Sequence, residues 1–182
     1  MIKGPKYYKS TLIISSILFV FLLGGCGSVY DQVSDVKKEP SETKAKSFSE
    51  VVAELNTPGK VYSWMGKNIR YKTDESYADE FRDPEMTFAL KYGDCDDYAV
   101  LADYILKKHG YDSQVVSVFT SEAGHTVCVW KDAAGKYNHL SNSSIRLISA
   151  DKLENVANDV YANWKVYSIY PDNQGIVNPA AN

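Results

Sequence analysis

The chain of 182 residues has few cysteines, no excess of positive charge and only one long apolar run. Its three cysteines, Cys26, Cys95 and Cys128, are an odd number, which argues against a closed disulfide framework. Lysine and arginine together number 20, against 23 acidic residues. A protein with this balance lacks the basic surface that binds nucleic acid phosphates. Disulfide-stapled scaffolds and nucleic-acid-binding proteins are therefore excluded first.

The apolar run lies close to the N-terminus. Lys3, Lys6 and Lys9 precede it, and it extends over residues 11–23. This is too short for a standard membrane span but suits the core of a signal peptide. The run ends in Leu-Gly-Gly followed by Cys26, which resembles the lipobox of bacterial lipoproteins. That resemblance implies that Cys26 carries a lipid and becomes the first residue of the mature protein.

Four segments follow from this pattern. Residues 1–25 are expected to be the signal peptide. Residues 26–46 are expected to be a disordered spacer, because this second segment is polar, charged and poor in large apolar side chains. One globular domain is expected over residues 47–171, which is long enough to bury a core of its own. Residues 172–182 then form a C-terminal tail.

Within the domain, apolar residues first recur at helical spacing and later alternate as in strands. Helices followed by an antiparallel sheet make an α+β architecture. The predicted helices are 47–55, 60–68, 84–92, 95–109 and 150–157, and the predicted strands are 114–120, 125–131, 136–142 and 164–170.

Cys95 and His125 are the candidate catalytic pair. Cys95 begins a predicted helix, where the unpaired N–H groups and the helix dipole favour a thiolate. His125 begins a predicted strand directly after Gly124. A nucleophilic cysteine needs an imidazole within reach, and the imidazole needs an acceptor that orients it. An inert cysteine at the helix start is the alternative for Cys95.

The hairpin after His125 predicts which residue orients the imidazole. A turn centred between Ala133 and Ala134 places Asn142 opposite His125, whereas a one-residue bulge would substitute Ser141. Asn142 is therefore the predicted third member. The same register places His139 opposite Cys128, and Cys128 itself is expected to be a buried thiol without a catalytic role.

These motifs resemble a known family. The stretch Lys-Tyr-Gly-Asp-Cys-Asp-Asp-Tyr-Ala around Cys95, with Gly-His-Thr-Val at His125, is similar to transglutaminase-like proteins, in particular to the bacterial transglutaminase-like cysteine proteinases. The resemblance implies a papain-like fold, with Cys95 as nucleophile and His125 as base. The third residue of that family is usually Asp, whereas this chain has Asn142 beside Ser141. Some members bind calcium through carboxylates near the nucleophile, so Asp94, Asp96 and Asp97 are candidate ligands unless they only cap the helix.

Three functions are compatible with the sequence. The first is a membrane-anchored cysteine peptidase or amidase that acts on a peptide or protein at the cell envelope. The second is an inactive transglutaminase-like binding module, and the third is an interaction lipoprotein whose 14 tyrosines face a partner. A monomer anchored through lipidated Cys26 and facing the extracytoplasmic side is expected. We expect no cofactor, and calcium is the one alternative.

Overall fold

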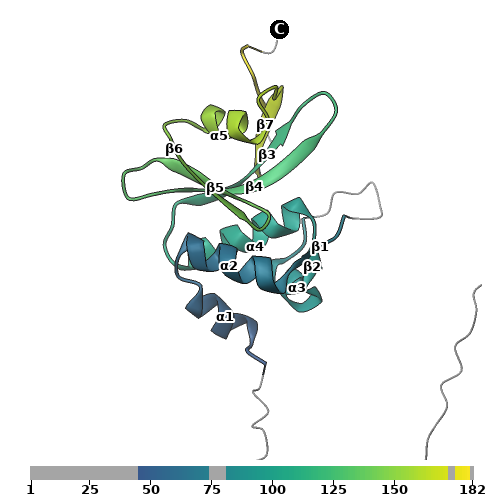
Figure 1. Ribbon diagram of the computed structural model, residues 1–182, viewed down its shortest axis with the longest axis vertical. Coiled ribbons are helices and arrows are strands. Elements are labelled where there is room, and N and C mark those ends of the chain that lie inside the picture. The colour runs from purple at the N-terminus through teal and green to yellow at the C-terminus, as the bar shows by residue number, and fades with distance from the viewer. Residues whose placement is uncertain (1–44, 74–80, 172–174, 181–182) are drawn as a thin grey trace, which may run out of the picture. The chain divides into compact units, whose positions relative to one another are not determined.

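The computed structural model describes residues 45–73, 81–171 and 175–180 (Figure 1). The predicted signal peptide and residues 26–44 of the predicted spacer lie outside these residues. Residues 43–182 form one compact unit, and its architecture is α+β, as predicted. In the part of the chain that the structure describes, no helix is both long and apolar enough to cross a bilayer.

Five helices occur in the described residues, and their starts follow capping signals in the sequence. Ser47 and Glu50 form the predicted capping box at the first helix, and Pro84 occupies the first turn of the third. The last helix begins three residues later than predicted. The helices are α1 (Phe48–Glu54), α2 (Pro58–Asn68), α3 (Pro84–Leu90), α4 (Cys95–Lys108) and α5 (Leu153–Val160).

Six strands form an antiparallel sheet in the order β6-β5-β4-β3-β7-β8, and a separate two-stranded parallel sheet joins β1 to β2. Four of the six strands in the large sheet were predicted, whereas β6 and β8 were not. The strands are β1 (Arg70–Tyr71), β2 (Tyr92–Gly93), β3 (Ser113–Phe119), β4 (Gly124–Lys131), β5 (Tyr137–Ser141), β6 (Ser144–Ala150), β7 (Val166–Tyr170) and β8 (Gly175–Val177).

The large sheet buries both of its faces. On one face, Cys128 and Leu140 pack with the apolar sides of α1, α2 and α4, and on the other Val127 and Val129 pack with α5 and Trp164. Figure 1 shows α5 on one side of the sheet and the other helices on the opposite side. This layering places the N-terminus of α4 beside the sheet.

Candidate active site

Cys95 is the first residue of α4, as the sequence predicts, and its side chain is half-buried. Strand β2 leads directly into this helix through Gly93. A β-carbon at Gly93 would lie 2.9 Å from the Asp97 carboxyl carbon, so the tight turn into α4 requires glycine. Cys95 thus lies in the first turn of a helix, the region whose backbone N–H groups and dipole can stabilise a thiolate or an oxyanion.

Helix α4 packs along β4 in a direction that brings Cys95 to the Gly124 end of that strand. Asp103, in the second half of α4, accepts a hydrogen bond of 2.7 Å from Ser113, which pairs with Trp130 near the end of β4. The first turn of α4 therefore lies toward the beginning of β4, where His125 is found. Cys128 is fully buried, and burial holds the pKa of its thiol well above the usual value, which confirms the prediction of an apolar thiol.

His125 is half-buried at the start of β4. Its Nε2 atom shares a hydrogen bond of 2.8 Å with the hydroxyl of Ser141, the last residue of β5. Burial lowers the pKa of His125, and the nearby His139 lowers it further. The imidazole is therefore neutral at pH 7, in the form that can accept a proton from a thiol.

The predicted hairpin register is wrong by one residue. Cys128 pairs with Leu140 and Val129 with His139, whereas the prediction paired Val127 with Leu140. The cause is the turn, in which Gly135 has a φ of +74° and its N–H donates to Asp132 O at 2.9 Å. The loop therefore has three residues and ends in a left-handed glycine, rather than the two residues assumed.

This shift moves Ser141 onto the face of the sheet that His125 occupies, because a one-residue slip reverses every side chain of a strand. The predicted pairing of Asn142 with His125 is therefore corrected to Ser141. Asn142 lies in the two-residue turn between β5 and β6 with a φ of +52°, a conformation that asparagine tolerates well. Its Oδ1 atom is buried and has no hydrogen-bond partner among the described residues.

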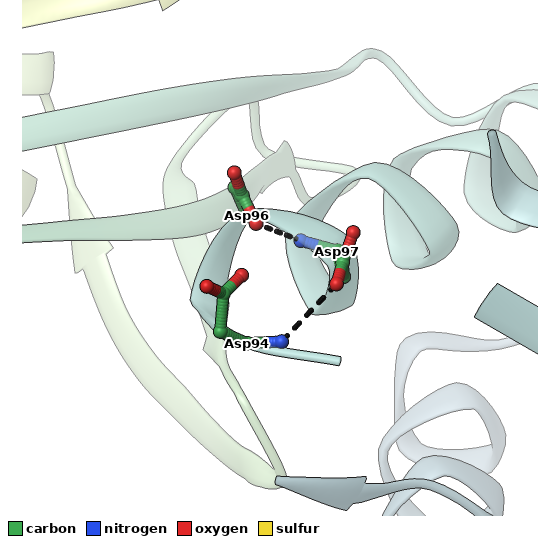
Figure 2. A group of neighbouring side chains, drawn as sticks. All are labelled: Asp94, Asp96 and Asp97. Carbon is green, nitrogen blue, oxygen red and sulfur yellow. Dashed lines mark hydrogen bonds between the residues drawn. The ribbon is translucent and has the colours of Figure 1, made fainter. Parts of the chain in front are cut away.

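Three carboxylates surround the first turn of α4 (Figure 2). Asp96 accepts a hydrogen bond of 2.6 Å from the Asp97 N–H, and Asp97 accepts one of 3.2 Å from the Asp94 N–H. Asp97 also forms an ion pair with Arg82. The ligand atoms of the three side chains lie within 4.8 Å of one another.

Two oxygen atoms of this cluster are buried without a hydrogen-bond partner in the described part of the chain, Oδ1 of Asp94 and Oδ2 of Asp96. Asp94 is 7% exposed and Asp96 is 1% exposed. Burial is the main cause that raises the pKa of Asp96 to about 8, and the neighbouring Asp94 is the second. Buried carboxylates of this kind need a proton or a cation to compensate their charge. Hard oxygen donors match calcium, so the residues present fit that ion.

A second polar cluster, which no sequence motif indicated, lies on the face of the sheet that α5 covers. His139 Nε2 shares a hydrogen bond of 2.8 Å with Asp159 of α5, and Arg146 of β6 holds the same carboxylate with contacts of 2.6 and 2.9 Å. These contacts lower the pKa of Asp159 to about 2. The predicted pairing of His139 with Cys128 is therefore wrong, because the two side chains lie on opposite faces.

Comparison with known proteins shows the family of the chain. A family model described as the transglutaminase-like superfamily matches residues 42–169. Among solved structures, calcium-bound LapG from Legionella pneumophila is similar to this chain, with a TM-score of 0.49 and 14% sequence identity over 73% of this chain and 80% of that chain. No curated protein sequence matches the chain.

Proposed function

Because the chain belongs to the transglutaminase-like superfamily, we propose that it is a cysteine hydrolase that cleaves an amide bond in a peptide or protein. The observation that carries the proposal is that α4 and β4 begin at the same end of the layer they form. Cys95 begins the helix there, and His125 begins the strand with its imidazole tied to Ser141 at 2.8 Å. These are the two groups that thiol-based acyl transfer requires.

In the proposed reaction, His125 accepts the proton of Cys95 and the sulfur attacks the substrate carbonyl carbon. The Cys95 N–H stabilises the oxyanion that forms. His125 then gives the proton to the departing amine, which leaves an acyl group on Cys95. Water attacks this thioester after giving a proton to His125, and the carboxylic acid product and the thiol are released.

The position of Ser141 favours the alternative function, a binding module without catalysis. A serine hydroxyl orients the imidazole of His125 but, unlike a carboxylate, does not stabilise its protonated form by charge. The lowered pKa of His125 also disfavours the protonated imidazole that an ion pair with Cys95 would need. Catalysis by this site therefore depends on the helix N-terminus and on its backbone N–H groups more than on an ion pair.

Thiol alkylation with peptide mapping tests the proposal. At pH 7, an activated Cys95 should react much faster than Cys128, which is 0% exposed and serves as the internal control. His125→Ala should slow alkylation at Cys95, and both His125→Ala and Cys95→Ala should abolish cleavage of a peptide library. Equal labelling of Cys95 in wild type and His125→Ala, without cleavage, would favour the binding module.

We also propose that Asp94 and Asp96 bind a calcium ion, with Asp97 held beside them by Arg82. The support is the pair of buried oxygen atoms without partners in the described residues. A bound cation would supply positive charge next to the first turn of α4 and fix the loop before Cys95. A calcium-dependent rise in melting temperature tests this site.

For the whole protein, we propose anchoring through lipidated Cys26 at the cell envelope, with the domain on the extracytoplasmic side. The apolar run and the small residues before Cys26 support this assignment. The partner is then the membrane on one side and a peptide or protein substrate on the other. We propose that the domain acts as a monomer.

A further inference from the structure

Strand β1 has one side paired and one side open. Arg70 N–H donates to Lys91 O and Lys72 N–H donates to Gly93 O, both at 2.9 Å. Successive peptide groups of a strand point to opposite sides, so the N–H and C=O of Tyr71 point away from β2. Within the described ranges, neither group has a hydrogen-bond partner. The outer side of β1 therefore offers one donor and one acceptor to an extended chain.

The open side of β1 belongs to the same locality as Cys95. Tyr71 pairs in register with Gly93, two residues before the thiol. The Tyr71 ring lies 6.4 Å from the ring of Tyr98 in the first turn of α4, and the residue remains 49% exposed. Burial raises the pKa of the Tyr71 hydroxyl, and the nearby Cys95 and Asp94 also raise this pKa.

A second tyrosine approaches from the opposite layer. Tyr161 follows α5, and its hydroxyl donates to Gly124 O at 3.5 Å, directly before His125. Tyr161 therefore lies at the end of the sheet where β4 begins with His125.

We infer that the outer edge of β1 is the docking strand for the substrate: one residue of an extended polypeptide exchanges both main-chain hydrogen bonds with Tyr71. This inference rests on the proposed hydrolase function and deepens it. It identifies the substrate class as an unfolded or strand-like segment of a protein, because the main-chain groups inside a helix are already paired and a single amino acid amide cannot span the edge.

Two variants of Tyr71 separate the main-chain contact from the ring. Tyr71→Ala removes the ring and keeps the N–H, whereas Tyr71→Pro removes both. Proline is tolerated at an open strand edge, and the bonds made by Arg70 and Lys72 remain. With a peptide that the full chain cleaves, KM should be about fivefold to tenfold higher for Tyr71→Pro than for Tyr71→Ala, the effect of one hydrogen bond. Alkylation of Cys95 by a small reagent should be the same in both variants.

A scan of the substrate provides the second measurement, which does not depend on the variants folding. N-methylation should raise KM by about tenfold at one position of the peptide and have little effect at its neighbours, whose N–H groups face away from β1. Equal KM values for the two variants, or a scan with no sensitive position, overturn the docking strand and leave hydrolysis standing. Absence of both peptide cleavage and enhanced Cys95 labelling overturns the hydrolase and the docking strand together.

Discussion

Ser141 is the residue whose side chain meets the imidazole of His125, and its hydroxyl carries no charge. We expect Ser141→Ala to slow alkylation and turnover at Cys95 by about tenfold to a hundredfold, because a hydrogen bond to a charged imidazole contributes about 1.5–3 kcal/mol. Ser141→Asp should restore or exceed the wild-type rate, since a carboxylate also stabilises imidazolium. Stopped-flow alkylation at pH 7 measures both effects.

Asn142 supplies the matched control for this experiment. It occupies a left-handed turn position next to Ser141, so Asn142→Gly keeps the backbone conformation while removing the side chain. The rate at Cys95 should stay within about twofold of wild type, as expected for a change that removes no hydrogen bond to His125. A large loss in Asn142→Gly with a silent Ser141→Ala would return the orienting role to Asn142.

Gly93 allows the tight turn from β2 into α4 before Cys95 because it has no side chain. In Gly93→Ala the new methyl group meets the Asp97 side chain, whose carboxylate holds the Arg82 side chain and the Asp94 N–H. We expect a loss of about 1–3 kcal/mol in the free energy of unfolding, as for other overpacked sites. Urea denaturation measures it. Gly59→Ala has open space around the new methyl group and should cost less than half as much.

At the scale of elements, the first turn of α4 is the proposed calcium site. Calcium at millimolar concentration should raise the melting temperature of the wild type, since a ligand that binds only the folded state stabilises it. Magnesium should have a smaller effect, because it demands tighter octahedral geometry. Asp94→Asn and Asp96→Asn should remove the response, whereas Asp112→Asn, at an exposed ion pair, should retain it. A calcium response that survives in both cluster variants would place the ion elsewhere.

The hairpin β4–β5 shows how far sequence patterns determine this site. Both strands and the positions of Cys95 and His125 follow from apolar periodicity and helix-start residues, which are local properties. The third residue depends on whether the turn has two residues or three, and Ala133-Ala134-Gly135 is compatible with both readings. Only the left-handed φ of Gly135 decides the register. The contact between His139 and Asp159 joins residues 20 positions apart and has no local sequence pattern at all.

The same contact between β5 and α5 predicts a pH dependence of stability. Burial outweighs the carboxylate of Asp159 and lowers the pKa of His139, so the unfolded chain binds a proton more readily than the folded one. The free energy of unfolding should therefore fall as pH drops below about 6.5. Asp159, with its pKa of about 2, adds stability above pH ~4 that is lost between ~4 and 2.

His139→Gln separates this residue from the other titrating groups. Glutamine can still donate a hydrogen bond to Asp159 but does not titrate, so the loss of stability between pH 7 and 5 should be smaller than in wild type. Urea denaturation at several pH values gives the two slopes. Parallel curves for wild type and His139→Gln would show that His139 does not carry the effect.

At the scale of the whole molecule, charge and apolar content divide the chain into parts with different tasks. Three of the 20 basic residues lie in the predicted signal peptide, which leaves 17 against 23 acidic residues, or −6, for the rest. A domain with this charge is repelled by anionic lipid headgroups, so electrostatic attraction would not hold it at a membrane. The proposed lipid anchor would supply the membrane attachment that the charge of the domain does not.

The proposed anchor is Cys26, and the three cysteines of the chain allow a clean test. Growth with an alkyne-tagged fatty acid should label the wild type, and Cys26→Ser should lose the label because it lacks the thiol that accepts the lipid. Cys95→Ser and Cys128→Ser should keep it, since lipidation reads the sequence before the cysteine and not the folded domain. The membrane fraction distinguishes two results for Cys26→Ser: retention without label means an uncleaved apolar run, and release means cleavage as an ordinary signal peptide. A label that persists in Cys26→Ser would place the lipid on another residue and remove the basis for anchoring through this site.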